Sequence, residues 1–138
     1  MRTGFYVSAA LFFAACCIPA LEFRSDRNVP DIMFGLRALA VGWSGVFAAV
    51  FSWYANPFWF LGMVLGLFRK PLPAGICGVV AIAIALTLLS DLGRVLPADE
   101  GGVTHTSIYR MLPGFYVWMA SLVMIPVAAI LQKFVPAI

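Results

Sequence analysis

Charged residues are scarce in this chain. Only 11% of its 138 residues are Asp, Glu, Lys or Arg, while 63% are hydrophobic. A typical soluble domain is roughly 25% charged and roughly 45–50% apolar. So few charges cannot coat a water-soluble globule of this size, and the 12 Phe, 4 Trp and 4 Tyr exclude a disordered chain. Together with a mean hydropathy of +0.99, the composition indicates a small integral membrane protein.

Histidine and cysteine are scarce as well. The chain has one His and 3 Cys, an odd number that indicates no disulfide framework. A metal site needs several converging ligands, so we predict no metal site and no cofactor. The cysteines Cys16, Cys17 and Cys77 are interpreted as small packing residues. The net charge is +3, and the basic residues do not form a stripe, which argues against nucleic acid as a partner.

Long apolar runs fill most of the chain. A helix that crosses a bilayer needs roughly 20 apolar residues. Five runs approach this length, at residues 4–21, 36–54, 57–70, 74–91 and 113–132, with polar loops at 22–31 and 92–112. We therefore predict an all-α integral membrane protein, in which residues 1–138 form a single transmembrane domain built as a bundle of five spanning helices.

The uncharged stretch at residues 38–68 is too long for one span. Its 31 residues would make a helix about 46 Å long at 1.5 Å per residue. Asn56 is a preferred N-cap residue and Pro57 suits the first position of a helix. The sequence therefore predicts a tight helical hairpin at Trp53–Pro57. In an alternative model with four spans, residues 57–68 lie in the membrane interface or re-enter the membrane.

The distribution of Lys and Arg predicts an orientation. Five spans with the N-terminus outside place six of the 9 basic residues inside and three outside, whereas four spans place four inside and five outside. The positive-inside rule therefore favours five spans, with the N-terminus outside and the C-terminus in the cytoplasm of a bacterial inner membrane.

Three groups of residues are candidates for contacts with other molecules. In the five-span model, an aromatic rim lies at the outer surface, formed by Trp53, Tyr54, Asn56, Pro57, Tyr116 and Trp118. Gly62 and Gly66 form a G-x-x-x-G pair that allows close helix packing. The loop at residues 91–112 contains groups capable of acid or base chemistry, namely Asp99, Glu100 and His105.

Two motifs carry a resemblance. They are Trp53-Tyr54-Ala55-Asn56-Pro57 and the run from Gly114 to Ser121, which reads G-F-Y-V-W-M-A-S. The chain resembles small uncharacterised bacterial multi-span membrane proteins that have a W-Y-A-N-P turn and a G-Y-Y-x-W-x-A-S start to the final helix. The resemblance covers residues 35–130 and implies an integral bacterial membrane protein without a known activity. Phe115 replaces the first tyrosine of the second motif.

Three functions are compatible with these observations. We favour a non-enzymatic protein that acts by protein–protein interaction, as an accessory subunit of a membrane complex or as an immunity-type protein. Its expected partners are membrane lipids and a membrane protein or a second copy. The first alternative is a small oligomeric channel or transporter, with polar side chains at Ser44, Ser52, Thr87 and Ser121. The second is an enzyme acting on an envelope lipid through the 91–112 loop. No catalytic residue is assigned.

Overall fold

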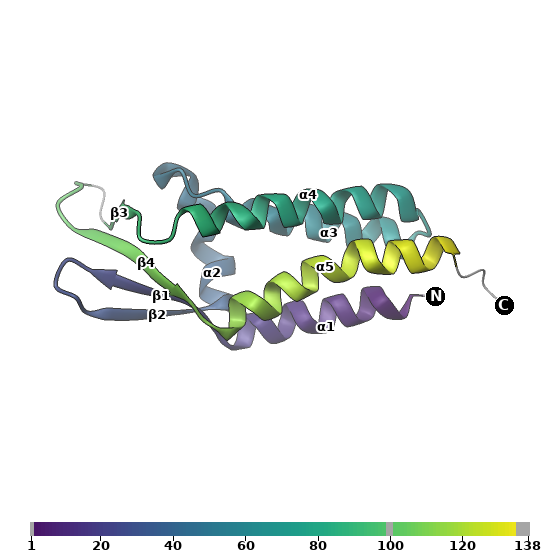
Figure 1. Ribbon diagram of the computed structural model, residues 1–138, viewed down its shortest axis with the longest axis horizontal. Helices are drawn as coiled ribbons and strands as arrows, with labels where there is room; N and C mark the ends of the chain where they lie inside the picture. The colour runs from purple at the N-terminus through teal and green to yellow at the C-terminus, as the bar shows by residue number, and fades with distance from the viewer. Residues whose placement is uncertain (1, 99–100, 135–138) are drawn as a thin grey trace.

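The long helices lie side by side, and an antiparallel sheet extends from one end of them (Figure 1). This computed structural model describes residues 2–98 and 101–134. The helices are α1 (Thr3–Cys17), α2 (Gly35–Val41), α3 (Ala55–Leu67), α4 (Pro71–Ser90) and α5 (Pro113–Phe134), and two 3-10 segments are η1 (Gly42–Ala48) and η2 (Ser52–Tyr54). The strands are β1 (Pro19–Ser25), β2 (Pro30–Phe34), β3 (Val95–Pro97) and β4 (His105–Met111).

The predicted all-α bundle of five spanning helices is wrong. The segments interpreted as polar loops, 22–31 and 92–112, contribute to a four-stranded sheet with the order β2-β1-β4-β3. The signal for β1 was an alternation, since apolar Leu21 and Phe23 are interleaved with charged Glu22 and Arg24. That period of two is typical of a strand with one buried face, but the charges alone suggested a loop.

The predicted span at 36–54 and the predicted hairpin at Trp53–Pro57 are also wrong. The helix α2 ends at Val41, and a 3-10 segment follows it up to Ala48. Ala49 then adopts the left-handed conformation, with φ of 54°, which stops the helical backbone. After Phe51, η2 leads directly into α3, so Asn56 and Pro57 lie in the first turn of α3 rather than in a turn between antiparallel helices. The irregular segment of the fold is therefore 42–51 and not the 57–68 of the four-span alternative.

The core of the helical half combines aromatic stacking with a buried polar chain. Phe12 stacks on Trp59, with ring centroids 4.0 Å apart. The Trp59 indole donates to Ser8 Oγ at 2.9 Å, and that hydroxyl donates to the Ser121 carbonyl at 2.7 Å. Because buried polar groups need partners, this chain fixes the relative positions of α1, α3 and α5.

Two helices, α4 with 20 residues and α5 with 22, are long and apolar enough to cross a membrane. The other two helices of this half, α1 and α3, have 15 and 13 residues. Gly4, in the first turn of α1, lies against Ala128 near the end of α5. Both therefore lie at the end away from the sheet (Figure 1), whereas five spans would place the two termini on opposite sides.

Gly66 provides a test of the helix packing. A β-carbon at this position would overlap the ring of Phe5, which is fully buried. We expect Gly66→Ala to lower the free energy of unfolding by about 1–3 kcal/mol, as overpacking usually does. The measurement is thermal or denaturant unfolding in detergent.

Gly75→Ala is the matched control. A β-carbon on Gly75 would meet the Ala129 side chain at 3.5 Å, an ordinary contact, and alanine is the better helix former. We expect Gly75→Ala to leave stability unchanged or to raise it. Equal destabilisation by both changes would contradict the packing of α1 on α3.

Candidate functional site

A cavity of about 790 Å³ lies at the junction between the helices and the sheet. This volume is within the range of small-molecule sites, roughly 300–1,000 Å³. The helices contribute Phe12, Leu88, Phe115 and Trp118, and the sheet contributes Leu21, Phe23, Leu96 and Ile108. The third wall is the segment at 35–50. None of the described lining residues is charged, so the cavity is suited to an apolar molecule.

The sheet faces the cavity with its apolar side because of strand register. In β1, Leu21 and Phe23 line the cavity, while Glu22 lies on the opposite face. The pairing of β1 with β4 shifts register between Glu22 and Phe23, which pair with Arg110 and Ile108. Such a β-bulge re-aims side chains. It brings Arg110 to Glu22 while Ile108 still faces the cavity.

The wall formed by α2 and η1 has no buried residue, so hydrogen bonds hold it in place. The Trp53 indole donates to the Leu39 carbonyl at 2.8 Å. Arg94 donates to the carbonyls of Ala48 and Ala49. A salt bridge of 2.8 Å to the buried Asp91 holds Arg94. Partly buried side chains of this wall, among them Leu39 and Ala48, also pack against the core clusters, so hydrogen bonds and peripheral packing together hold it in place.

A few polar side chains line the helical end of the cavity. The Trp118 indole donates to Asn56 Oδ1 at 2.9 Å and links α5 to α3. Ser52, which is 7% exposed, lies four residues before Asn56 and also lines the cavity. The cavity thus combines apolar walls with a small number of polar groups, the usual composition of a ligand site.

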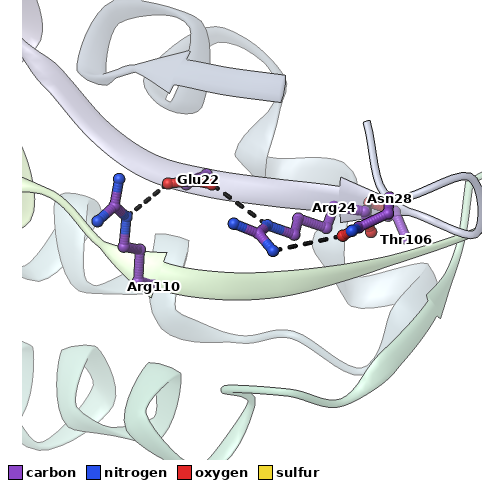
Figure 2. A network of polar contacts seen from close by, with 5 residues as sticks. All are labelled: Glu22, Arg24, Asn28, Thr106 and Arg110. Atoms are coloured by element: carbon purple, nitrogen blue, oxygen red, sulfur yellow. Dashed lines mark hydrogen bonds and ion pairs between the residues drawn. The ribbon is translucent and has the colours of Figure 1, made fainter. Parts of the chain in front are cut away.

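The face of the sheet opposite the cavity is polar, and Glu22 forms ion pairs with two arginines there (Figure 2). The Glu22 carboxylate accepts hydrogen bonds from Arg110 at 2.5 Å and from Arg24 at 3.4 Å. Arg24 also lies 3.5 Å above the ring of Tyr109. The hydrogen bond from Arg110 and the neighbouring positive charges lower the pKa of the Glu22 carboxyl below its ordinary value near 4.5. This carboxylate joins β1 to β4 on the face opposite the cavity.

The predicted aromatic rim is divided between several environments. Trp53, Asn56 and Trp118 line the cavity. The Tyr54 hydroxyl donates to the Trp43 carbonyl at 3.3 Å, while Pro57 and Tyr116 are exposed. The structure therefore brings together three of the six residues, on the inner side of the junction.

The glycine pair and the polar loop are placed separately from the cavity. Gly62 lies against Ile125 and Gly66 lies against Phe5, so both face helices of the same molecule. At the far end of the sheet, the His105 backbone N–H donates to Asp26 Oδ2 at 3.0 Å, and His105 Nδ1 lies 3.5 Å from the same oxygen. Asp99 and Glu100 lie outside the described residues.

The hydroxyls expected for a channel mostly bond to nearby carbonyls. Ser44 donates to Val41, Thr87 to Ile84 and Ser121 to Trp118, at distances of 2.6–2.7 Å. Ser52 is the exception, and it lines the cavity.

The sequence alone did not reveal the roles of Glu22, Asp91 and Arg94. The alternation of apolar and charged residues around Glu22 could have indicated its place on a strand. The contact of Arg94 with Ala48 joins residues 46 apart in the chain, and no sequence pattern indicates it.

Comparison of the chain with protein-family models, curated proteins and solved structures found no match. The resemblance to small bacterial membrane proteins that the two motifs suggest therefore stays a prediction.

The Glu22 cluster predicts a pH dependence of stability. A carboxyl whose pKa is lowered in the folded state stabilises it above the unfolded pKa, and this contribution is lost as pH falls through the folded value. We expect the unfolding temperature of the native protein to exceed that of Glu22→Gln at pH 7. The difference should shrink as the pH falls below about 4.5.

Asp31→Asn is the control, because the Asp31–Arg37 pair is exposed on both sides and exposed pairs contribute little. Thermal unfolding of the three proteins between pH 7 and pH 3 makes the comparison. A difference between the native protein and Glu22→Gln that does not vary with pH would show that the Glu22 charge has no stabilising role.

Proposed function

We propose that the protein is a non-enzymatic, membrane-embedded binding protein that holds an apolar molecule in the cavity beneath its sheet. The observation that carries this proposal is the cavity itself, which measures about 790 Å³ and whose walls, over residues 2–98 and 101–134, contain no charged residue. Burial of apolar surface would drive binding, at roughly 25 cal/mol per Å².

The outward faces of the helices support a membrane location. Large apolar side chains on α1, α4 and α5 are exposed, including Phe13 at 67%, Val79 at 59% and Ile130 at 56%. Contiguous exposed apolar surface of this kind marks a membrane or protein contact. We propose that α4 and α5 cross the bilayer, that α1 and α3 pack beside them in the same layer, and that the sheet lies at one membrane surface. The motif resemblance implies a bacterial inner membrane.

The charges at the two ends support one orientation. At the end away from the sheet lie Arg2, Arg69, Lys70 and Lys133, whereas every Asp and Glu among the described residues lies at the sheet end. Of the five arginines at the sheet end, Arg24, Arg37, Arg94 and Arg110 are paired with these acids, while Arg27 is exposed and has no acidic partner among the described residues. The anionic lipids of a cytoplasmic membrane surface attract unpaired cations, and four such cations lie at the end away from the sheet against one at the sheet end. We therefore propose that the sheet faces outward, and that the start of α1 and the end of α5 face the cytoplasm.

Action as an accessory subunit or immunity-type protein stays a second proposal. The observation that favours it is β2, an edge strand that pairs on one side only with β1. The free side of an edge strand can pair with an extended segment of a partner. Ile32 and Phe34 are also exposed on β2, and these apolar side chains would contribute contacts with such a partner.

A cavity-filling substitution tests the binding proposal. Ala38 lines the cavity from α2, so Ala38→Trp should occupy part of its volume. The probe is a hexadecane that carries a diazirine, and mass spectrometry maps the peptides that it labels after irradiation. We expect labelling of β1 and β4 in the native protein and its loss, by about tenfold or more, in Ala38→Trp.

Leu36→Trp is the matched control, because Leu36 lies on the same short helix but is 64% exposed. It should leave the labelling of β1 and β4 unchanged. Labelling confined to the outward faces of α1, α4 and α5 would overturn the binding proposal. It would leave the membrane location intact.

Single cysteines test the location and the orientation. In a variant with its native cysteines replaced by alanine, Thr3→Cys and Val29→Cys place thiols at the two ends without removing a charge; both positions are exposed. We expect a membrane-impermeant maleimide added to intact spheroplasts to label position 29, and to label position 3 only after permeabilisation. The opposite pattern would reverse the orientation, and recovery of the protein in the soluble fraction would contradict the membrane location.

A further inference from the structure

Two hydrogen-bonding side chains in the cavity have donor groups that no other described residue uses. Ser52 and Asn56 lie four residues apart on continuous helical backbone, and both line the cavity. Residues at this spacing share one face of a helix. Apart from the Cys16 thiol, which is a weak donor, the other polar side chains of the described lining have partners, since Ser44 donates to Val41, Thr106 to Arg24 and Trp53 to Leu39.

The hydrogen bond from Trp118 fixes the orientation of the Asn56 amide. An indole nitrogen is a donor only, so the amide oxygen faces Trp118 and the amide nitrogen, with its two hydrogens, faces away. Among the described residues, neither this nitrogen nor the Ser52 hydroxyl has a hydrogen-bond partner. Ser52 is only 7% exposed. Two donors are therefore available to an occupant of the cavity.

These donors restrict the chemistry of the occupant. A carbonyl oxygen has two lone pairs and can accept one hydrogen bond from each side chain. A purely hydrocarbon occupant would leave both donors unmet, and unmet buried donors are costly. An ionised head group would be buried beside walls in which the described residues have no charge to pair with it, which is costlier still.

We propose, as an extension of the binding function above, that the ligand is a neutral amphiphile whose carbonyl oxygen is bound by Ser52 and Asn56. Its hydrocarbon chain fills the apolar part of the cavity. Two kinds of membrane molecule have this chemistry, the acyl ester of a neutral glycerolipid and the ring carbonyl of a prenyl quinone.

The experiment compares two competitors of equal length, 2-heptadecanone and heptadecane, against cavity labelling by the diazirine probe. We expect the ketone to compete at about a tenfold lower concentration than the alkane in the native protein. In Ser52→Ala and in Asn56→Leu the ketone should lose this advantage, while competition by heptadecane stays within about twofold of the native value.

Ser44→Ala is the matched control. It also removes a hydroxyl from the cavity lining, but one that already donates to Val41, so the preference for the ketone should persist. Asn56→Leu also removes the bond to Trp118, and Ser52→Ala keeps the test valid if Asn56→Leu does not fold.

The outcomes separate the two proposals. Equal competition by ketone and alkane in the native protein would overturn the assignment of Ser52 and Asn56 and leave the cavity as a hydrocarbon site. If neither the ketone nor the alkane competes with the probe, both the assignment of Ser52 and Asn56 and the binding function of the cavity are overturned. Dipalmitoylglycerol and a short-chain prenyl quinone, added separately as competitors, then distinguish the ester from the quinone. Stronger competition by sodium palmitate than by the ketone would contradict the requirement for a neutral head group.

Discussion

The pairing of β1 with β4 is the constraint on which the rest of the structure depends. β1 follows α1 and β4 precedes α5. The segment α1–β1 therefore runs antiparallel to the segment β4–α5 through both the helices and the sheet (Figure 1). At the joint, Leu112 donates to the Ala20 carbonyl at 2.9 Å, and Gly114 lies against the Pro19 carbonyl with no room for a side chain. The cavity forms where the sheet diverges from α3 and α4, next to this joint.

The wall at 35–50 closes that space, and its side chains are only partly buried where they pack against the core. It is attached by Arg94, by the Trp53 indole and by backbone bonds such as that of Gly35 to Ile18. Segments with few buried side chains open at low free-energy cost. The buried Asp91 holds Arg94, so the position of the wall depends on the last turn of α4. In the proposed function, opening of this segment is the route by which an apolar molecule enters the cavity while the helical core stays intact.

The sequence predicted the apolar helices better than their ends. Ranges 74–91 and 113–132 overlap α4 and α5, because long apolar runs with proline at the start leave few alternatives. The strands were missed because charge was read as a sign of loops, although Leu21, Glu22, Phe23 and Arg24 alternate. Within the site, motif reading selected Asn56 and Trp118 but not their contact, which joins residues 62 apart. Contacts of such separation depend on the topology, and no local pattern encodes them.

The register of β1 explains how a sheet with several charges can cover an uncharged cavity. A slip of one residue would exchange the two faces of a strand and turn Glu22 inward, where none of the described lining residues is a cation. Pairing of Glu22 with Arg110 and Arg24 on the outer face opposes that slip. The Glu22–Arg110 ion pair that joins β1 to β4 therefore also keeps the Glu22 charge away from the cavity. In the proposed function, the donors at Ser52 and Asn56 select molecules that combine a hydrocarbon chain with one acceptor oxygen.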